Sequence, residues 1–253
     1  MIRRADGGDW LVIRQPDHAA LCGLFADRWG AGPFAPVAPR ESVILAAREH
    51  DNGWLEWEAA PTVDPEAAHP RNFTEMPIPE VLAIWRRGPR RVADRDPYAG
   101  LLVSLHATRL FRPRLAAGRD PAEDQEHLRD FLEEQAGFQA KLREALGLDE
   151  AVVASHSRLL GTWDRLSLLL CCGPTPAATL EAVPARQGPL AVNLVPDGER
   201  SAALEPYPFA GGLLVVAVPA RRIPARRYPT PDALREALVA APAETLTFAL
   251  HPA

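Results

Sequence analysis

The residues of this sequence best suited to chemistry are three histidines and two aspartates spread along its first two thirds. They are His18, the adjacent pair His50-Asp51, His106 and Asp164. Imidazole nitrogens and carboxylate oxygens suit iron, manganese or zinc better than calcium. We therefore predict that His18, His50, Asp51 and Asp164 bind a divalent transition metal, with one or two ions per chain.

The first two ligand positions fall at the ends of predicted helices. Pro16 suits the first turn of a helix, where its missing N–H costs nothing, and His18 follows within that turn. A second helix is predicted from about residue 40 to His50. It ends in Asp51-Asn52-Gly53, where Gly53 could take the positive φ that closes a helix. Two consecutive side chains at a helix end can both reach one ion.

The remaining candidates lie inside predicted helices. His106 belongs to a helix of about residues 98–111, and Asp164 to a helix of about residues 150–172. A helix of about residues 121–146 separates the two. Helices packed as a bundle can each direct one side chain to a common point. The sequence around these residues is apolar, so unpaired polar groups there would be costly, and a shared metal would remove that cost.

The change in pattern after Gly173 divides the chain into two predicted parts. Residues 1–175 are predicted to form a helical metal-binding core with an N-terminal strand at 10–14. Residues 176–253 are predicted to form a small β-rich α+β appendage packed on that core, which the N-terminal strand could join. The expected elements of this appendage are strands at 189–195, 212–218 and 246–251 and a helix at 230–239. The predicted fold class is therefore mainly α.

A proline-rich segment, residues 58–79, follows the His-Asp turn. Irregular segments of this length in compact domains are often functional. Because it contains Phe73 and Met76, we expect an ordered lid or wall beside the site. Trp54, Trp57 and Phe73 could form an apolar wall of a pocket.

The order of the candidate ligands resembles that of the HD superfamily of metalloproteins. His50-Asp51-Asn52-Gly53 is similar to its H-D-x-G turn, and Asp164-Arg165-Leu166-Ser167 to its final D-x-L-S helix. The resemblance covers about residues 10–175 and implies an HD-like helical bundle. The superfamily's hydrolases and oxygenases often have lysine or histidine directly after this turn, where this chain has Trp54.

A second resemblance is to an uncharacterised bacterial family, domain of unknown function 3891. It implies shared structure and no known activity. The similar segments are Gln15–His18, His50–Trp54, Asn72–Pro77 and Leu102–His106.

Other residues could extend the site. The HD resemblance implies that His106 could bind a second ion or act in catalysis, and a core histidine is the alternative. Arg165 follows Asp164, and Arg109 lies about one turn beyond His106, so either could bind a phosphate or carboxylate. His156 is too far along the helix to bind the ion of Asp164, but it could reach the substrate or a second ion.

Three functions remain open from the sequence. The first is a metal-dependent hydrolase of a small phosphate ester, in which a metal-activated water is the nucleophile. The second, by resemblance, is a di-iron oxygenase of the inositol- and phosphonate-cleaving type. The third is a non-catalytic scaffold with a structural metal.

Composition limits the location and partners of the protein. The 253 residues are 47% hydrophobic and 24% charged, with a formal net charge of -5. This acidic balance argues against nucleic acid as a partner, and no apolar run is long enough for a membrane span. Three cysteines without metal-binding spacing predict reduced thiols and a cytoplasmic protein. The expected partner is a small-molecule substrate, and a homodimer is possible.

Overall fold

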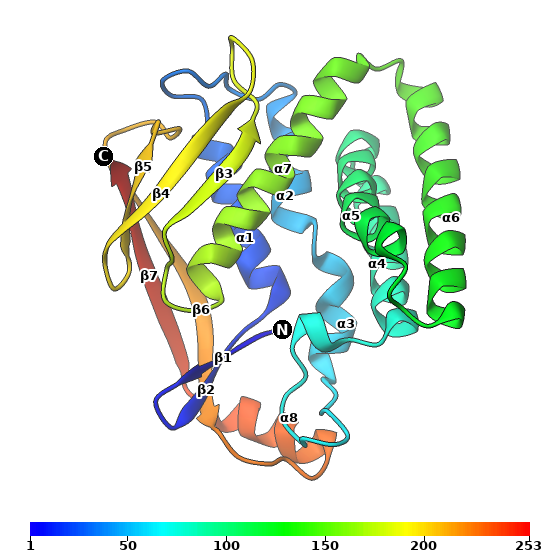
Figure 1. Ribbon diagram of the computed structural model, residues 1–253, viewed down its shortest axis with the longest axis vertical. Coiled ribbons are helices and arrows are strands. Elements are labelled where there is room, and N and C mark those ends of the chain that lie inside the picture. The colour runs from blue at the N-terminus through cyan, green and yellow to red at the C-terminus, as the bar shows by residue number, and fades with distance from the viewer.

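The structure is an α+β fold in which a helical layer packs on one face of a seven-stranded sheet (Figure 1). The computed structural model describes all residues, 1–253. In Figure 1, α1 and α7 lie beside the sheet, while α4, α5 and α6 lie farther from it. Contacts between α1 and β6 and between α7 and β3 join the two layers.

Most of the helices lie in the first two thirds of the chain. None is both long and apolar enough to cross a membrane. The α-helices are α1 (Gln15–Arg28), α2 (Arg40–Glu49), α3 (Leu55–Ala59), α4 (Ile78–Ala93), α5 (Pro97–Ala117), α6 (Ala122–Leu146), α7 (Glu150–Cys171) and α8 (Pro231–Ala240), and two short 3-10 helices are η1 (Asn52–Trp54) and η2 (Phe73–Glu75).

The sheet combines strands from both ends of the chain. Its strands are β1 (Ile2–Asp6), β2 (Asp9–Ile13), β3 (Ala178–Val183), β4 (Leu190–Gly198), β5 (Ser201–Glu205), β6 (Leu214–Pro224) and β7 (Ala243–Pro252). Their spatial order is β1-β2-β6-β7-β5-β4-β3. Only β5 and β7 pair in parallel, and Trp10 of β2 lies opposite Ile223 of β6.

The predicted fold class, a mainly α HD-like bundle with a small β-rich appendage, is wrong. Helices hold 51% of the residues, but strands hold 22% in one mixed sheet. The short strands β1, β3 and β5 were not expected from the sequence, and the N-terminal hairpin completes the sheet by pairing with β6. One cluster of 40 buried residues includes Phe25 and Trp163 of the helices and Val216 and Phe248 of the sheet.

Helix α4 was also not expected. The helix begins directly after Pro77, and Gly88 and Pro89 lie within it. Glycine and proline usually mark turns or loops. Tertiary packing overrides these signals, because Val81, Trp85 and neighbouring residues are buried on one side of the helix. Proline inside a helix costs one backbone hydrogen bond, and this burial offsets the loss.

Gly53, in the turn after the His-Asp pair, has a different role from the one expected. It is not among the residues with positive φ. A Cβ at this position would lie 2.3 Å from the carbonyl oxygen of Ile84, because η1 packs directly on the backbone of α4. Glycine is required for this close approach, which fixes the turn that carries His50 and Asp51.

We expect Gly53→Ala to lower the free energy of unfolding by about 1–3 kcal/mol, because the new methyl group must displace the backbone of α4. Chemical denaturation would measure this change. Gly137→Ala in α6 is the matched control, since nothing lies within 4 Å of a Cβ there. The control should be neutral or stabilise by up to about 1 kcal/mol. Equal effects of the two substitutions would contradict the close approach.

Candidate metal centre

The structure brings the four predicted ligands and His106 into one buried cluster. His18 comes from α1, the His50-Asp51 pair from the end of α2, His106 from α5 and Asp164 from α7. All three histidines are only 1% exposed, and the two aspartates are 3% and 8% exposed. Four helices therefore supply nitrogen and oxygen atoms to one point inside the protein.

The distances around His50 suit ligands of one ion better than hydrogen bonds. His50 Nε2 lies 3.6 Å from Asp51 Oδ2 and 3.5 Å from Asp164 Oδ1. His106 Nε2 lies 3.7 Å from Asp164 Oδ2. Hydrogen bonds of this type are about 2.7–3.2 Å long. Two ligand atoms that each bind an ion at about 2.0–2.2 Å are roughly 3.0–3.6 Å apart.

An unpaired nitrogen of His50 supports the same interpretation. His50 Nδ1 donates to the carbonyl oxygen of Ala47 at 2.8 Å, a contact that orients Nε2 toward the carboxylates. His50 Nε2 and His106 Nδ1 are both buried without a hydrogen-bond partner. Buried polar groups are normally paired, so the residues present fit a metal ion that would engage His50 Nε2. His50, His106 and Asp164 offer ligand atoms within 4.8 Å of one another, as do His18, Cys22 and His50.

The pKa values of the two central histidines of the cluster are shifted in opposite directions. Burial by itself lowers the pKa of His50, but the carboxylates of Asp51 and Asp164 outweigh it and raise that pKa to about 9. Burial dominates at His106 and lowers its pKa to about 3. Burial would raise the pKa values of Asp51 and Asp164, yet the neighbouring histidines hold both below the usual range. Two carboxylates are thus kept ionised inside the protein, and a divalent cation would balance their charge.

Ser167 fixes the orientation of His18. Its hydroxyl donates to the carbonyl oxygen of Asp164 at 2.8 Å, so its oxygen accepts from His18 Nδ1, also at 2.8 Å. His18 Nε2 then faces Asp51 Oδ2 at 2.7 Å, a contact that requires a proton between the two atoms. Metal binding to histidine or carboxylate displaces such a proton. His18 can therefore serve as a ligand or as the hydrogen-bond partner of Asp51.

A cavity of about 200 Å³ opens beside the cluster. Trp54 and Phe73 form part of its apolar wall, as expected, whereas Trp57 is not among its lining residues. Phe73, Thr74 and Met76 show that the end of the proline-rich segment does border the site. Most of the wall is apolar, and its polar members besides the cluster are Gln15, Thr74 and Arg114.

Arg114 is the cation of this cavity, and the sequence did not indicate it. Its guanidinium forms a bidentate ion pair with Asp120, at 2.9 Å from Nε and 2.8 Å from Nη2. Leu110 and Arg114 follow His106 by four and eight residues, but Arg109 follows it by three, so helical spacing alone does not distinguish the two arginines. Gln15, which also lines the cavity, lies three residues before His18 on α1, a spacing that places both side chains on the same side of the helix.

The structure does not bring the three predicted substrate-binding residues to this cavity. Arg109 lines a separate pocket and packs over Gly161 of α7. The cavity lies on the side of α5 that carries Leu110 and Arg114, about 100° or more around the helix from Arg109. Arg165 is exposed on a different side of α7 from Asp164. His156 is buried and hydrogen-bonded to the Tyr98 hydroxyl at 2.6 Å.

Comparison with known protein families places this chain in one of them. Residues 1–225 match the model of the family described as Protein of unknown function (DUF3891). The chain belongs to this family, which confirms that part of the sequence prediction. No curated protein and no solved structure matches the chain. The likeness to the HD superfamily stays a prediction.

We expect Ser167→Ala to lower the free energy of unfolding of the metal-free protein by about 1–3 kcal/mol, because it leaves the buried His18 Nδ1 unpaired. Urea unfolding would measure the change. Ser157→Ala, at a half-buried serine on the same helix outside the cluster, is the control and should have little effect. An equally small effect at Ser167 would show that its hydroxyl does not orient His18.

Proposed function

We propose that this protein is a metal-dependent hydrolase with one divalent transition metal ion per chain. The observation that carries the proposal is the meeting of five ligand side chains from four helices beside a cavity. The proposed ligands are His50, Asp51, His106 and Asp164, with His18 as a further ligand or as the partner of Asp51. Iron, manganese and zinc all suit this donor set.

The number of histidines in the cluster favours one metal ion over two. Two-metal members of the HD superfamily use extra histidines between the His-Asp pair and the last aspartate. Only His106 from that interval joins the cluster, because His69 contacts Arg3, His127 lies near Glu123 on α6 and His156 is hydrogen-bonded to Tyr98. This count disfavours the di-iron oxygenase, which requires ligands for a second iron. The order of the ligands, similar to that of the HD superfamily, also supports a catalytic metal.

A bound ion of this kind would act as a Lewis acid and lower the pKa of water to about 7. Asp51, held by His18 at 2.7 Å, would accept a proton from the attacking water and orient it. Ser167 and Ala47 would keep His18 and His50 in the required orientations through their Nδ1 contacts. Arg114 would meet an anionic group of the substrate at the cavity.

The volume of the cavity supports a small ester as the substrate. Its volume of about 200 Å³ is below the roughly 300–1,000 Å³ typical of sites for drug-sized ligands. The walls contributed by Trp54, Trp85 and Phe111 suit an apolar or aromatic group. We therefore propose a phosphate monoester of a small apolar alcohol as the substrate class, and we expect nucleotides to be poor substrates.

Protein purified without chelator or His-tag should contain about one iron, manganese or zinc ion per chain. Because the ion binds only the folded state, saturation at 100 times Kd should raise the free energy of unfolding by about 2.7 kcal/mol. Elemental analysis and urea unfolding with and without chelator would measure both quantities.

The matched variants for this test are Asp164→Asn, which should lose the metal, and His127→Ala, at a half-exposed histidine outside the cluster, which should keep it. Full occupancy in Asp164→Asn would contradict the proposed site. Two irons per chain with a mixed-valent paramagnetic signal would instead favour the oxygenase. A metal without turnover on any ester would favour a structural role.

A colorimetric screen of phosphomonoesters with the fully metallated protein would test the activity. We expect turnover of small aryl phosphates and its loss in Asp51→Asn. Arg114→Ala should raise KM about fivefold with a smaller change in kcat, because a half-exposed charged contact is partly screened. Arg112→Ala, on the same helix but lining another pocket, should leave KM unchanged. Silence across the screen would overturn the hydrolase proposal.

A further inference from the structure

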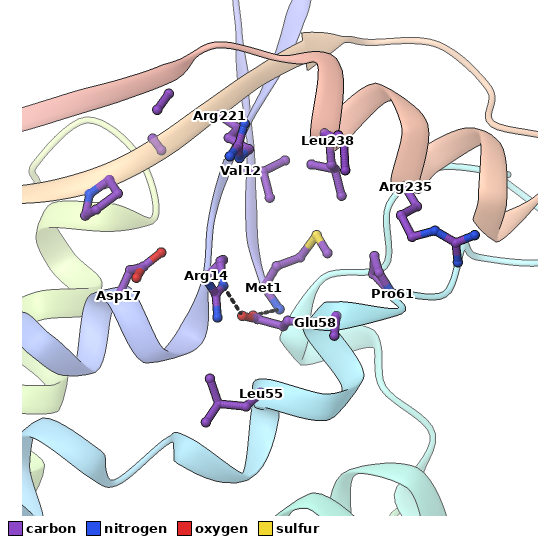
Figure 2. A pocket seen from close by; sticks show the side chains of 15 residues that line it. Met1, Val12, Arg14, Asp17, Leu55, Glu58, Pro61, Arg221, Arg235 and Leu238 are labelled. Atoms are coloured by element: carbon purple, nitrogen blue, oxygen red, sulfur yellow. Dashed lines mark hydrogen bonds and ion pairs between the residues drawn. The ribbon is translucent and has the colours of Figure 1, made fainter.

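A second and larger cavity lies on the other side of the first turn of α1. Its volume is about 510 Å³, within the usual range for small-molecule sites. Figure 2 shows Arg14, Asp17 and Glu58 near α1 and α3, with Arg235 and Leu238 projecting from α8. The cavity is separate from the candidate metal centre, since the two share no lining residue.

Positive charge exceeds negative charge on the wall of this cavity. Arg14, Arg221 and the amino group of Met1 share this wall with the two carboxylates Asp17 and Glu58, and the charge of Arg235 is balanced by Asp232, in a chain whose formal net charge is -5. A local excess of positive charge in an acidic protein attracts anions.

Glu58 is not available to repel an anion, because its charge is already compensated. Its side chain is only 1% exposed and accepts the backbone N–H of Gln15 at 2.8 Å. The amino nitrogen of Met1 lies 2.9 Å from the same carboxylate, and Arg14 Nε lies 3.4 Å from it (Figure 2). The buried carboxylate therefore forms a satisfied base for the cavity.

Two arginines have donors left for a ligand. Arg14 uses only Nε in its contact with Glu58, and Arg221 uses only Nη1 in its bond to the Ala241 carbonyl. Arg235 is instead paired with Asp232 at 2.8 Å. The planar guanidinium groups of Arg14 and Arg221 suit the two oxygens of a carboxylate.

The remaining wall is largely apolar, and part of it is exposed to solvent. Leu55 and Val239, 39% and 77% exposed, are two of the large hydrophobic residues that the fold leaves uncovered, and both line this cavity. Leu238 adjoins them on α8. Covering these side chains with an apolar group would be favourable.

We propose that this cavity binds a small organic acid with a carboxylate head and an apolar chain. The carboxylate contacts Arg14 and Arg221, and the chain covers Leu55, Leu238 and Val239.

Titration calorimetry with decanoate and with the uncharged decanol tests this proposal. Decanoate should bind about tenfold more tightly than decanol, a difference of about 1.4 kcal/mol. Arg14→Gln and Val239→Asp should each weaken decanoate binding about five- to tenfold. Arg14→Gln removes a charged donor to the carboxylate, and Val239→Asp places a like charge on the apolar wall.

Val152→Asp is the matched control, since Val152 is an exposed valine on α7 that does not line the cavity. It should bind decanoate like the unmodified protein, and circular dichroism would establish that all three variants are folded. Absence of decanoate binding, equal binding of decanol, or unchanged affinity in both Arg14→Gln and Val239→Asp would each overturn the proposal.

Discussion

The structure depends on the burial of two ionised carboxylates among three imidazoles. Asp51 and Asp164 are almost fully buried, where an unpaired charge would cost several kcal/mol. The histidines around them reduce that cost, but His50 Nε2, which lies near both carboxylates, is left without a hydrogen-bond partner. Such an arrangement would have a high free-energy cost in a purely structural core, and it suits a site that binds a cation. The helices that meet there are held in place by contacts elsewhere in the fold.

Those contacts come from two directions. On one side, α1 and α7 pack on the sheet, and the large apolar cluster continues from the helices into β6 and β7. On the other side, η1 packs against α4 through Gly53, and a second apolar cluster joins α4, α5 and α6 around the cavity. The cluster of histidines and aspartates lies between these two apolar regions, so its geometry follows from the packing of both.

The first turn of α1 separates two different chemical environments. Gln15 and His18 face the small aromatic cavity of the candidate metal centre, whereas Arg14 and Asp17 face the larger cavity lined by arginines. Glu58 accepts the first free backbone N–H of this helix, where the positive end of the helix dipole favours a carboxylate. The same buried side chain thus stabilises the start of α1 and forms part of the second cavity.

The sequence by itself determined the local features of this protein. The spacing of apolar residues predicted α1, α2, α5, α6 and α7, and the types and order of the polar residues on these helices indicated the candidate ligands His18, His50, Asp51 and Asp164. Only the tertiary structure decided the fold class, because short strands such as β1, β3 and β5 gain their stability from pairing with distant strands. It also decided which arginine lies at the cavity. Arg109 and Arg114 occupy the same helix, and the packing of α5 against its neighbours, not its sequence, directs Arg114 to the site and Arg109 toward Gly161.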